Sequence, residues 1–357
     1  MRKMVKGFIH RPGAHCGSTS LRDVFEFHGH KFSEDMVFGL NCGLGFVYWS
    51  MKRSVPPIFI GGLGSRGIED VCRILGIRWK KKTTTSAKKA WQAVKELIDN
   101  DVPVVLQVDM FYLDFWRGKT GHFGGHAIVL AGYDEERGEA YVTDVRNEKI
   151  EAERREDGLF ATSLESLAEA RSSTFKPFPP RNAWVTFAFP KELVPLEKAI
   201  KTAIKTNAGR FLESPIKNFG IKGIRHFANQ LIKWPDIIHG TVYDPIQFKA
   251  QVPMLKLNLF LAYAFMEEAG TGGGLFRRIY SRFLKESSDV LHAKILREAS
   301  DLMMKSADIW TEIAHVLLAT SEAQQDKVKD ILAEAQPKIT ECAEIEEKAF
   351  KLLASIA

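Results

Sequence analysis

A histidine and a cysteine stand side by side at His15 and Cys16, directly before residues 17–28, whose apolar spacing predicts a helix. At the start of a helix, unpaired N–H groups and the helix dipole favour the thiolate form of a cysteine. A thiolate attacks carbonyl carbons, so this position suits a covalent nucleophile. The same position also leaves open a metal ligand or a small buried residue of the core.

A cysteine nucleophile needs a base nearby and a third group that orients the base. Residues 124–145 contain two β-rich apolar runs around a turn-forming segment, which predicts a β-hairpin. His126 lies in its first strand and Asp144 at the end of its second, so antiparallel pairing brings them close. We therefore expect Cys16 as nucleophile, His126 as base and Asp144 as the orienting carboxylate.

Other assignments of the same residues weigh against this interpretation. Together with His28 and His30, His15 and Cys16 could hold a metal, but the chain lacks CxxC and HExxH spacing, so we expect no metal site. His15 is better suited to bonding a loop or shaping the site than to acting as the base. The three other cysteines are expected in the core: Cys42, Cys72 and Cys342.

The helices and strands that must position these residues are expected to form an α+β domain over 1–190, with helices first and an antiparallel sheet after them. Helices are expected at 17–28, from Ser33, at 65–75, 86–100 and 162–171, the last with a capping box from Thr162 to Glu165. Strands are expected at 44–49, 56–62, 102–110, 124–133, 139–145 and 182–189.

Strand signals stop near 190–195, and the rest of the chain is rich in Ala, Leu, Lys and Glu. We therefore predict a second, all-α domain over 191–357. Its glycine-rich segment at 270–274 lacks the Lys-Ser/Thr of a nucleotide P-loop, which argues against ATP binding. Either the segment is a helix–helix loop, or its amides cradle an anion with Arg277 and Arg278. The residues expected to bind substrate are Gly272, Gly273, Gly274, Arg277 and Arg278.

Composition narrows the class of protein. The chain of 357 residues is 45% hydrophobic and 26% charged, typical of a globular protein, and no apolar run is long enough to span a membrane. Four scattered cysteines and the lack of a signal peptide favour the cytoplasm. The net charge is +6, and residues 191–233 hold nine Lys and Arg against three Glu. That stretch is either a solvated face or a site for an acidic partner; the sequence shows no nucleic-acid module.

Several segments resemble a known family. The cysteine opening the first long helix, with "GGHAIVLAGYDEERGEAYVTD", resembles the papain-like cysteine peptidases, and among them the bacteriocin-leader peptidases. "HCGSTSLRDVFEFHGHKFSEDMVFGLNCGLGF" resembles the N-terminal domain of the butirosin-biosynthesis acyltransferase H family. "FGIKGIRHFA" and "EEAGTGGGLFRRIYSRFL" resemble the helical domain that usually follows it. The resemblance covers essentially the whole chain.

The resemblance implies transfer of an acyl or aminoacyl group from an acyl carrier protein thioester to an amine acceptor, with Cys16, His126 and Asp144 in the roles given above. It implies no bound cofactor, because the donor itself carries phosphopantetheine. Papain-like hydrolases usually supply a Gln before the nucleophile as oxyanion donor, but residues 1–15 contain none. We expect His10, His15 or backbone amides to replace it. Two rivals remain: a cysteine hydrolase on the same residues, and a binding or scaffold protein without turnover.

Overall fold

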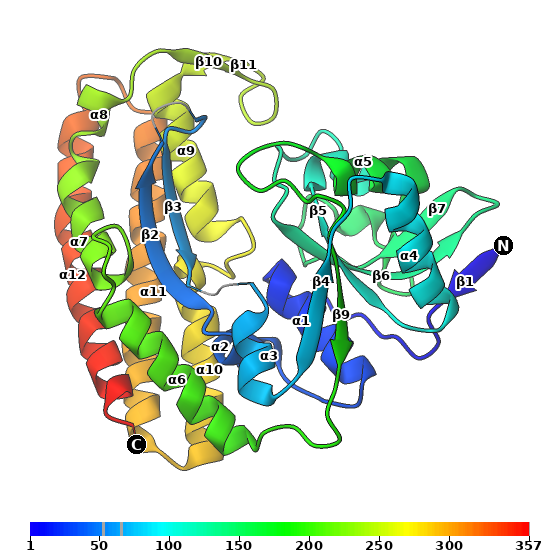
Figure 1. Ribbon diagram of the computed structural model, residues 1–357. Helices are drawn as coiled ribbons and strands as arrows, with labels where there is room; N and C mark the ends of the chain where they lie inside the picture. Colours follow the sequence, from blue (N-terminus) through cyan, green and yellow to red (C-terminus); the bar gives the residue numbers. More distant parts are fainter. Residues whose placement is uncertain (52–53, 65–66, 357) are drawn as a thin grey trace. The chain divides into compact units, whose positions relative to one another are not determined.

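The computed structural model describes residues 1–51, 54–64 and 67–356 of the chain (Figure 1). The chain forms two compact units: Met1–Val37 with Gly76–Leu193, and Phe38–Leu75 with the chain from Val194 onward. A division into 1–190 and 191–357 therefore differs at residues 38–75, which pack with the second unit. The reason is apolar contact, because Phe46 of this segment stacks on Trp310 and lies against Phe227.

The first unit is built on a seven-stranded antiparallel sheet with strand order β4-β9-β5-β6-β7-β8, and β1 pairs with β6. Its strands are β1 (Arg2–Met4), β4 (Arg78–Lys82), β5 (Val104–Val108), β6 (His126–Asp134), β7 (Glu139–Val142), β8 (Phe160–Ser163) and β9 (Trp184–Ala188). The expected hairpin is confirmed as β6–β7. Strands β1, β4 and β8 were not expected; the three lysines of β4 are exposed, as in a loop, yet their backbone pairs with β9.

Helices cover both faces of this sheet, and the alternation of side chains along β5 shows how. Val105 of β5 packs with Val24 of helix α1 (Cys16–Phe27). Val104, Leu106 and Val108 point the other way, into a core shared with α4 (Ala87–Asp99) and α5 (Leu164–Ser172). Because successive strand residues face opposite sides, α1 lies on one face and α4 and α5 on the other. The helix that begins at Cys16 is thereby fixed against β6 and β5.

Short elements complete the first unit. They are the beginning of α2 (Glu34–Leu40) and the 3-10 turns η1 (Met110–Tyr112), η2 (Asp114–Trp116) and η3 (Glu151–Glu153). The expected capping box of α5 is wrong by one residue: Ser163 is the N-cap, and its hydroxyl accepts from Ser166 N. The Thr162 hydroxyl instead donates to Asp114.

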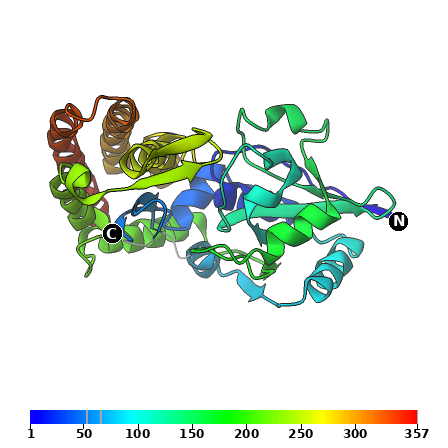
Figure 2. The same ribbon diagram turned by 90° about the horizontal axis from the view of Figure 1, so that it is seen from above.

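The second unit is mainly helical. Its helices are the rest of α2, α3 (Glu69–Leu75), α6 (Leu196–Leu212), α7 (Gly220–Leu231), α8 (Trp234–Ile237), α9 (Met254–Glu267), η4 (Gly274–Phe276), α10 (Arg277–Leu291), α11 (Lys294–Ser321) and α12 (Val328–Ala354). The long helices α11 and α12 lie side by side, orange and red in Figures 1 and 2. Residues 65 and 66, at the start of an expected helix, lie outside the described residues.

One hairpin makes the expectation of an all-α domain over 191–357 wrong, because strands β10 (Thr241–Asp244) and β11 (Ala250–Pro253) pair after α8. The strands expected near 44–49 and 56–62 are present as β2 (Leu44–Ser50) and β3 (Ile58–Leu63). They pair with each other and pack on α7 and α9 of the second unit. In the part of the chain that the structure describes, no helix combines the length and the apolar character that crossing a membrane requires.

Candidate active site

Helix α1 begins at Cys16, as the sequence predicts, and His15 is its N-cap. The Ser18 amide donates to His15 Nδ1 over 3.2 Å, and the Thr19 amide donates to the His15 carbonyl over 2.9 Å. Gly17 leaves room for the His15 ring, since a Cβ at this position would lie 3.0 Å from its Cε1. Cys16 itself is partly exposed, whereas the three other cysteines are buried.

His126 and Asp144 meet at one end of the β6–β7 hairpin, and both side chains are buried. The His126 Nε2 atom lies 3.0 Å from each carboxylate oxygen of Asp144. Two further donors hold the carboxylate: Trp116 Nε1 at 2.9 Å and the Val145 amide at 2.7 Å. Asp144 is therefore saturated with donors, and the ring it holds has a fixed orientation.

Cys16 reaches the same histidine from α1. Burial of the His126 ring opposes its protonation, but the charge of Asp144, the charge of Cys16 and a hydrogen bond from each raise the pKa of His126 well above its ordinary value. Since Nε2 faces Asp144, the nitrogen left for the Cys16 sulfur is Nδ1. The structure thus brings together the three residues that the sequence nominates, in the order thiol, imidazole, carboxylate.

His15 lies beside this group as a neutral ring. Burial lowers the pKa of His15 to about 4; the Glu34 carboxylate opposes this shift, and the His126 charge adds to it. Because Nδ1 accepts from the Ser18 amide, the proton of the neutral ring is on Nε2. His15 therefore caps the N-terminus of α1 and does not act as a base at neutral pH.

Glu34 closes the turn before Cys16. Its carboxylate accepts from the amides of Ala14 and His15 and from the hydroxyls of Ser18 and Thr19. Gly13 is required here, because a Cβ on it would overlap with the side chains of Thr19 and Glu34. The first turn of α1 is therefore rigidly held.

His10 does not occupy the place expected of an oxyanion donor. Its Nδ1 lies 2.6 Å from Asp23 Oδ2, and its Nε2 lies 2.9 Å from the Asp144 carbonyl oxygen. The His10 side chain is fully buried. Both ring nitrogens are therefore already engaged, and the expectation that His10 donates to an oxyanion is wrong; its contact with Asp144 still shapes the site.

The alternative of a metal cluster fails on distance. Helix α1 has 12 residues, so its ends are about 18 Å apart. His28 and His30 lie beyond its C-terminal end and both stack on Phe189, whereas Cys16 opens the helix. Among the described residues, no group of three or more potential metal ligands gathers at any point.

Arg277 does not bind an anionic substrate, contrary to the expectation from its glycine-rich neighbourhood. Its side chain is fully buried and forms a bidentate ion pair with Glu346, at 2.8 and 2.9 Å. Its remaining donor groups reach the carbonyls of Gly45 and Leu275. The Ser306 hydroxyl and the Trp310 indole complete the shell of Glu346, so the pair belongs to the core of the second unit.

Gly273, Gly274 and Arg278 are likewise committed within the second unit. Arg278 pairs with Asp308 at 2.9 Å. The Gly274 amide donates to Glu267, and the Gly273 amide donates to Thr271. A Cβ on Gly274 would lie 2.7 Å from Ala307, so the glycine allows close packing on α11. The segment connects α9 to α10, and the expectation that Gly273, Gly274, Arg277 and Arg278 form an anion cradle is wrong, whereas that for Gly272 stays a prediction.

The two arginines give a direct test of this correction. Arg277→Met leaves the buried Glu346 carboxylate without its guanidinium partner and should lower the free energy of unfolding by about 3–5 kcal/mol. Arg278→Met breaks a pair between a half-buried arginine and the exposed Asp308 and should cost about 0–1 kcal/mol. Urea unfolding followed by circular dichroism measures both. Equal costs for the two variants would contradict the buried-pair assignment.

Three contacts of the site were not predicted from the sequence. The Trp116 indole bonds the Asp144 carboxylate, and His10, held by Asp23, bonds the Asp144 carbonyl. The Glu34 carboxylate bonds the backbone just before α1. Only one had a detectable signal. Asp23 follows Cys16 by seven residues, two turns of helix, and therefore lies on the same face of α1.

Two family models match the chain. The model described as "Butirosin biosynthesis protein H, N-terminal" matches residues 15–145, a range that includes Cys16, His126 and Asp144. A second model, "Domain of unknown function (DUF4872)", matches residues 165–353. No curated protein matches the chain.

Proposed function

We propose that this chain, which belongs to the butirosin biosynthesis protein H family, is a cysteine-dependent acyltransferase. Family membership indicates a biosynthetic enzyme, and the acyl-cysteine chemistry is the finer step that we infer. The observation that carries it is the partly exposed Cys16 at the start of α1, in contact with a buried His126 that Asp144 holds. A partly exposed cysteine beside a buried imidazole–carboxylate pair is the arrangement expected of an activated nucleophile.

The proposed reaction has two halves. The Cys16 thiolate attacks the carbonyl carbon of an acyl thioester, the C–S bond to the donor breaks, and the His126 imidazolium protonates the leaving thiolate. An amine then attacks the acyl-cysteine, and neutral His126 takes the amine proton. The new amide leaves as the C–S bond to Cys16 breaks, and the thiolate–imidazolium pair is restored. Asp144 supports the protonated ring in both halves.

The developing oxyanion needs donors, and α1 offers them. The amides of Cys16 and Gly17 are the first two of the helix and precede those of Ser18 and Thr19, which His15 already accepts. We assign the oxyanion contact to this turn, with His15 Nε2–H as its neighbour. This replaces the glutamine that papain-like hydrolases usually provide.

The papain-like fold is part of the same proposal. An antiparallel sheet with one helix carrying the nucleophile across its face, and the base on a sheet strand, supports it. We further propose an acyl carrier protein or another acidic thioester donor as partner. Exposed lysines follow one another on α6, Lys198, Lys201 and Lys205, and offer opposite charge. The acceptor is proposed to be a small molecule with an amine.

A trapped intermediate tests the function. The full chain should gain one acyl mass on Cys16 when mixed with a small acyl thioester and acid-quenched, as read by intact-protein and peptide mass spectrometry. A chase with a panel of amines should discharge the acyl group to amide faster than buffer discharges it to acid. Cys72→Ala is the matched control, since burial raises the pKa of Cys72 to about 12, and it should behave as wild type.

Each rival predicts another result. Discharge only to water across the panel, together with cleavage of an amide substrate, would replace the transferase by a hydrolase. No acyl mass with any thioester, in a folded chain, would favour a binding protein without turnover.

A further inference from the structure

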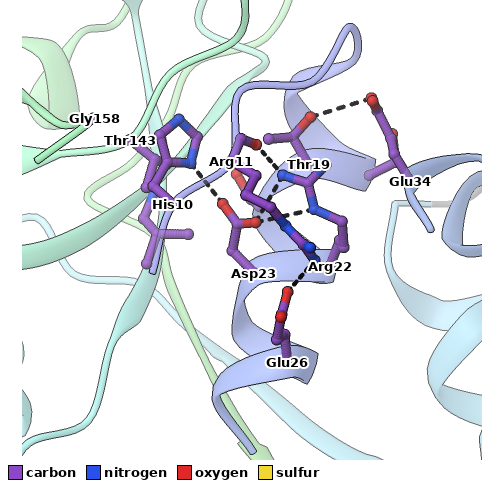
Figure 3. A network of polar contacts seen from close by, with 12 residues as sticks. His10, Arg11, Thr19, Arg22, Asp23, Glu26, Glu34, Thr143 and Gly158 are labelled. Atoms are coloured by element: carbon purple, nitrogen blue, oxygen red, sulfur yellow. Dashed lines mark hydrogen bonds and ion pairs between the residues drawn. The ribbon is translucent and has the colours of Figure 1, made fainter. Parts of the chain in front are cut away.

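His10 forms a buried bridge between the two parts of the candidate site. Its ring touches Asp23 on one side and the Asp144 carbonyl on the other, and neither the His10 nor the Asp23 side chain is exposed. Figure 3 shows the His10 and Asp23 side chains pointing toward one another, with Arg22 on the far side of the carboxylate. Because a carbonyl oxygen only accepts, His10 Nε2 is the donor to Asp144.

The Asp23 carboxylate is held firmly in turn. Arg22 donates to Asp23 Oδ1 from Nε at 3.0 Å and from Nη2 at 2.7 Å. Arg22 Nη2 also donates to the carbonyl of Arg11, which tethers the segment just after His10. With Oδ1 taken by the guanidinium, Oδ2 faces His10 Nδ1 at 2.6 Å, a distance typical of a charge-assisted bond.

The carbonyl that His10 holds belongs to the peptide between Asp144 and Val145. The N–H of that same peptide donates to Asp144 Oδ1 over 2.7 Å. In a planar trans peptide the C=O and N–H point in opposite directions, so fixing one end aims the other. A rotation of this peptide would remove the Val145 donor from the carboxylate that faces His126.

The His10 bridge also links Asp144 to α1, the helix that carries the nucleophile. Asp23 and Cys16 are seven residues apart on one face of α1. The contacts therefore form a closed circuit: Cys16 to His126, His126 to Asp144, Asp144 to His10, and His10 through Asp23 back to α1.

We propose that His10, anchored by Asp23, is a positioning residue that orients the 144–145 peptide and with it the Asp144 carboxylate toward His126. This inference rests on the proposed function, because it gives His10 a part in the activation of Cys16. His10 touches neither the thiol nor the reacting atoms; it acts through Asp144.

Two amide substitutions separate the two contacts of the ring. His10→Gln places an amide donor near the position of Nε2, so it keeps the bond to the Asp144 carbonyl. His10→Asn places its donor near Nδ1, so it keeps the bond to Asp23 alone. The readout is the pH dependence of iodoacetamide alkylation of Cys16 in the full chain, with thermal unfolding recorded in parallel. We expect His10→Asn to slow alkylation near pH 6 by about 10-fold to 10²-fold and to shift the profile to higher pH, while His10→Gln stays within about threefold of wild type.

His122→Asn is the matched control. His122 also bonds a buried carboxylate, but that of Asp109 at 2.9 Å and not that of Asp144. His122→Asn keeps a donor near Nδ1 for Asp109 but loses the ring that stacks on Phe111 and Phe175, so it should lose stability without a shift of the alkylation profile. If His10→Asn does not fold, Asp23→Asn replaces it, and a smaller shift in the same direction is expected.

The outcomes are distinct. A profile for His10→Asn that matches wild type overturns the positioning role and leaves the proposed function standing, as does an equal loss in the Gln and Asn variants. A wild-type Cys16 that alkylates no faster than the thiols of the urea-unfolded chain overturns the proposed function and this inference with it.

Discussion

Replacement of Cys16 by alanine is expected to abolish both the acyl-enzyme and the transfer product, with a loss of at least about 10³-fold in the rate of thioester turnover. No other cysteine can substitute for it. Burial raises the pKa of Cys42 and of Cys72 to about 12, and burial also raises the pKa of Cys342 well above its usual range. A thiol of pKa about 12 is ionised in roughly one molecule in 10⁵ at pH 7. We therefore expect acylation and alkylation at Cys16 and not at these three cysteines.

Alkylation checks this expectation without any substrate. Limiting iodoacetamide at pH 7, followed by peptide mapping, should label Cys16 first, and Cys16→Ala should leave the folded chain almost unlabelled. Circular dichroism should show the Cys16→Ala chain folded as wild type, because the residue is only partly buried at the first position of a helix. Rapid labelling of Cys42 or Cys342 in folded chain would contradict the assignment.

The nominated residues could be found from the sequence because local patterns place them. The helix from Cys16 follows from the spacing of Leu21, Val24 and Phe25, and the β6–β7 hairpin follows from two β-rich runs around a turn. A hairpin also fixes which residues face each other, so the meeting of His126 and Asp144 could be anticipated.

What could not be predicted depends on contacts between segments far apart in the chain. Arg277 follows a glycine-rich segment that resembles an anion site, but Glu346, 69 residues later, neutralises it in the core. No residue near Arg277 in the sequence indicates that Glu346 is its partner. In the same way, the strands expected at 44–49 and 56–62 were assigned to the first domain but belong to the second unit, because a strand pattern does not say what will cover its apolar face.

His10 illustrates the same limit at the site itself. From the sequence it was one of two histidines near the nucleophile, and proximity in the chain suggested contact with the oxyanion. Its actual partners lie 13 and 134 residues away. Buried polar groups are paired through tertiary structure, so their roles emerge only when the partners are known.

Asp144→Asn is expected to have the second large effect, a loss of about 10³-fold or more in the rate of acylation. Burial of the His126 ring opposes its charge, and the Asp144 carboxylate is the main group that overcomes this and raises the pKa of His126. An amide of the same shape removes that charge, so the ring loses its proton at a lower pH. Cys16 then lacks a cationic neighbour over the neutral range, and its alkylation profile should move to higher pH.

Asp134→Asn is the matched control for this substitution. Asp134 is also a buried carboxylate of the β6–β7 hairpin, but it bonds the turn amides of Glu136 and Arg137 at the other end of β6. It should leave both the acylation rate and the alkylation profile unchanged. Direct titration of the His126 ring by NMR in wild type and in Asp144→Asn gives the sign of the effect, with the variant expected to titrate at lower pH. A ring that titrates at the same pH in both proteins, with the alkylation profile unmoved, means that Asp144 holds the ring in place without activating it.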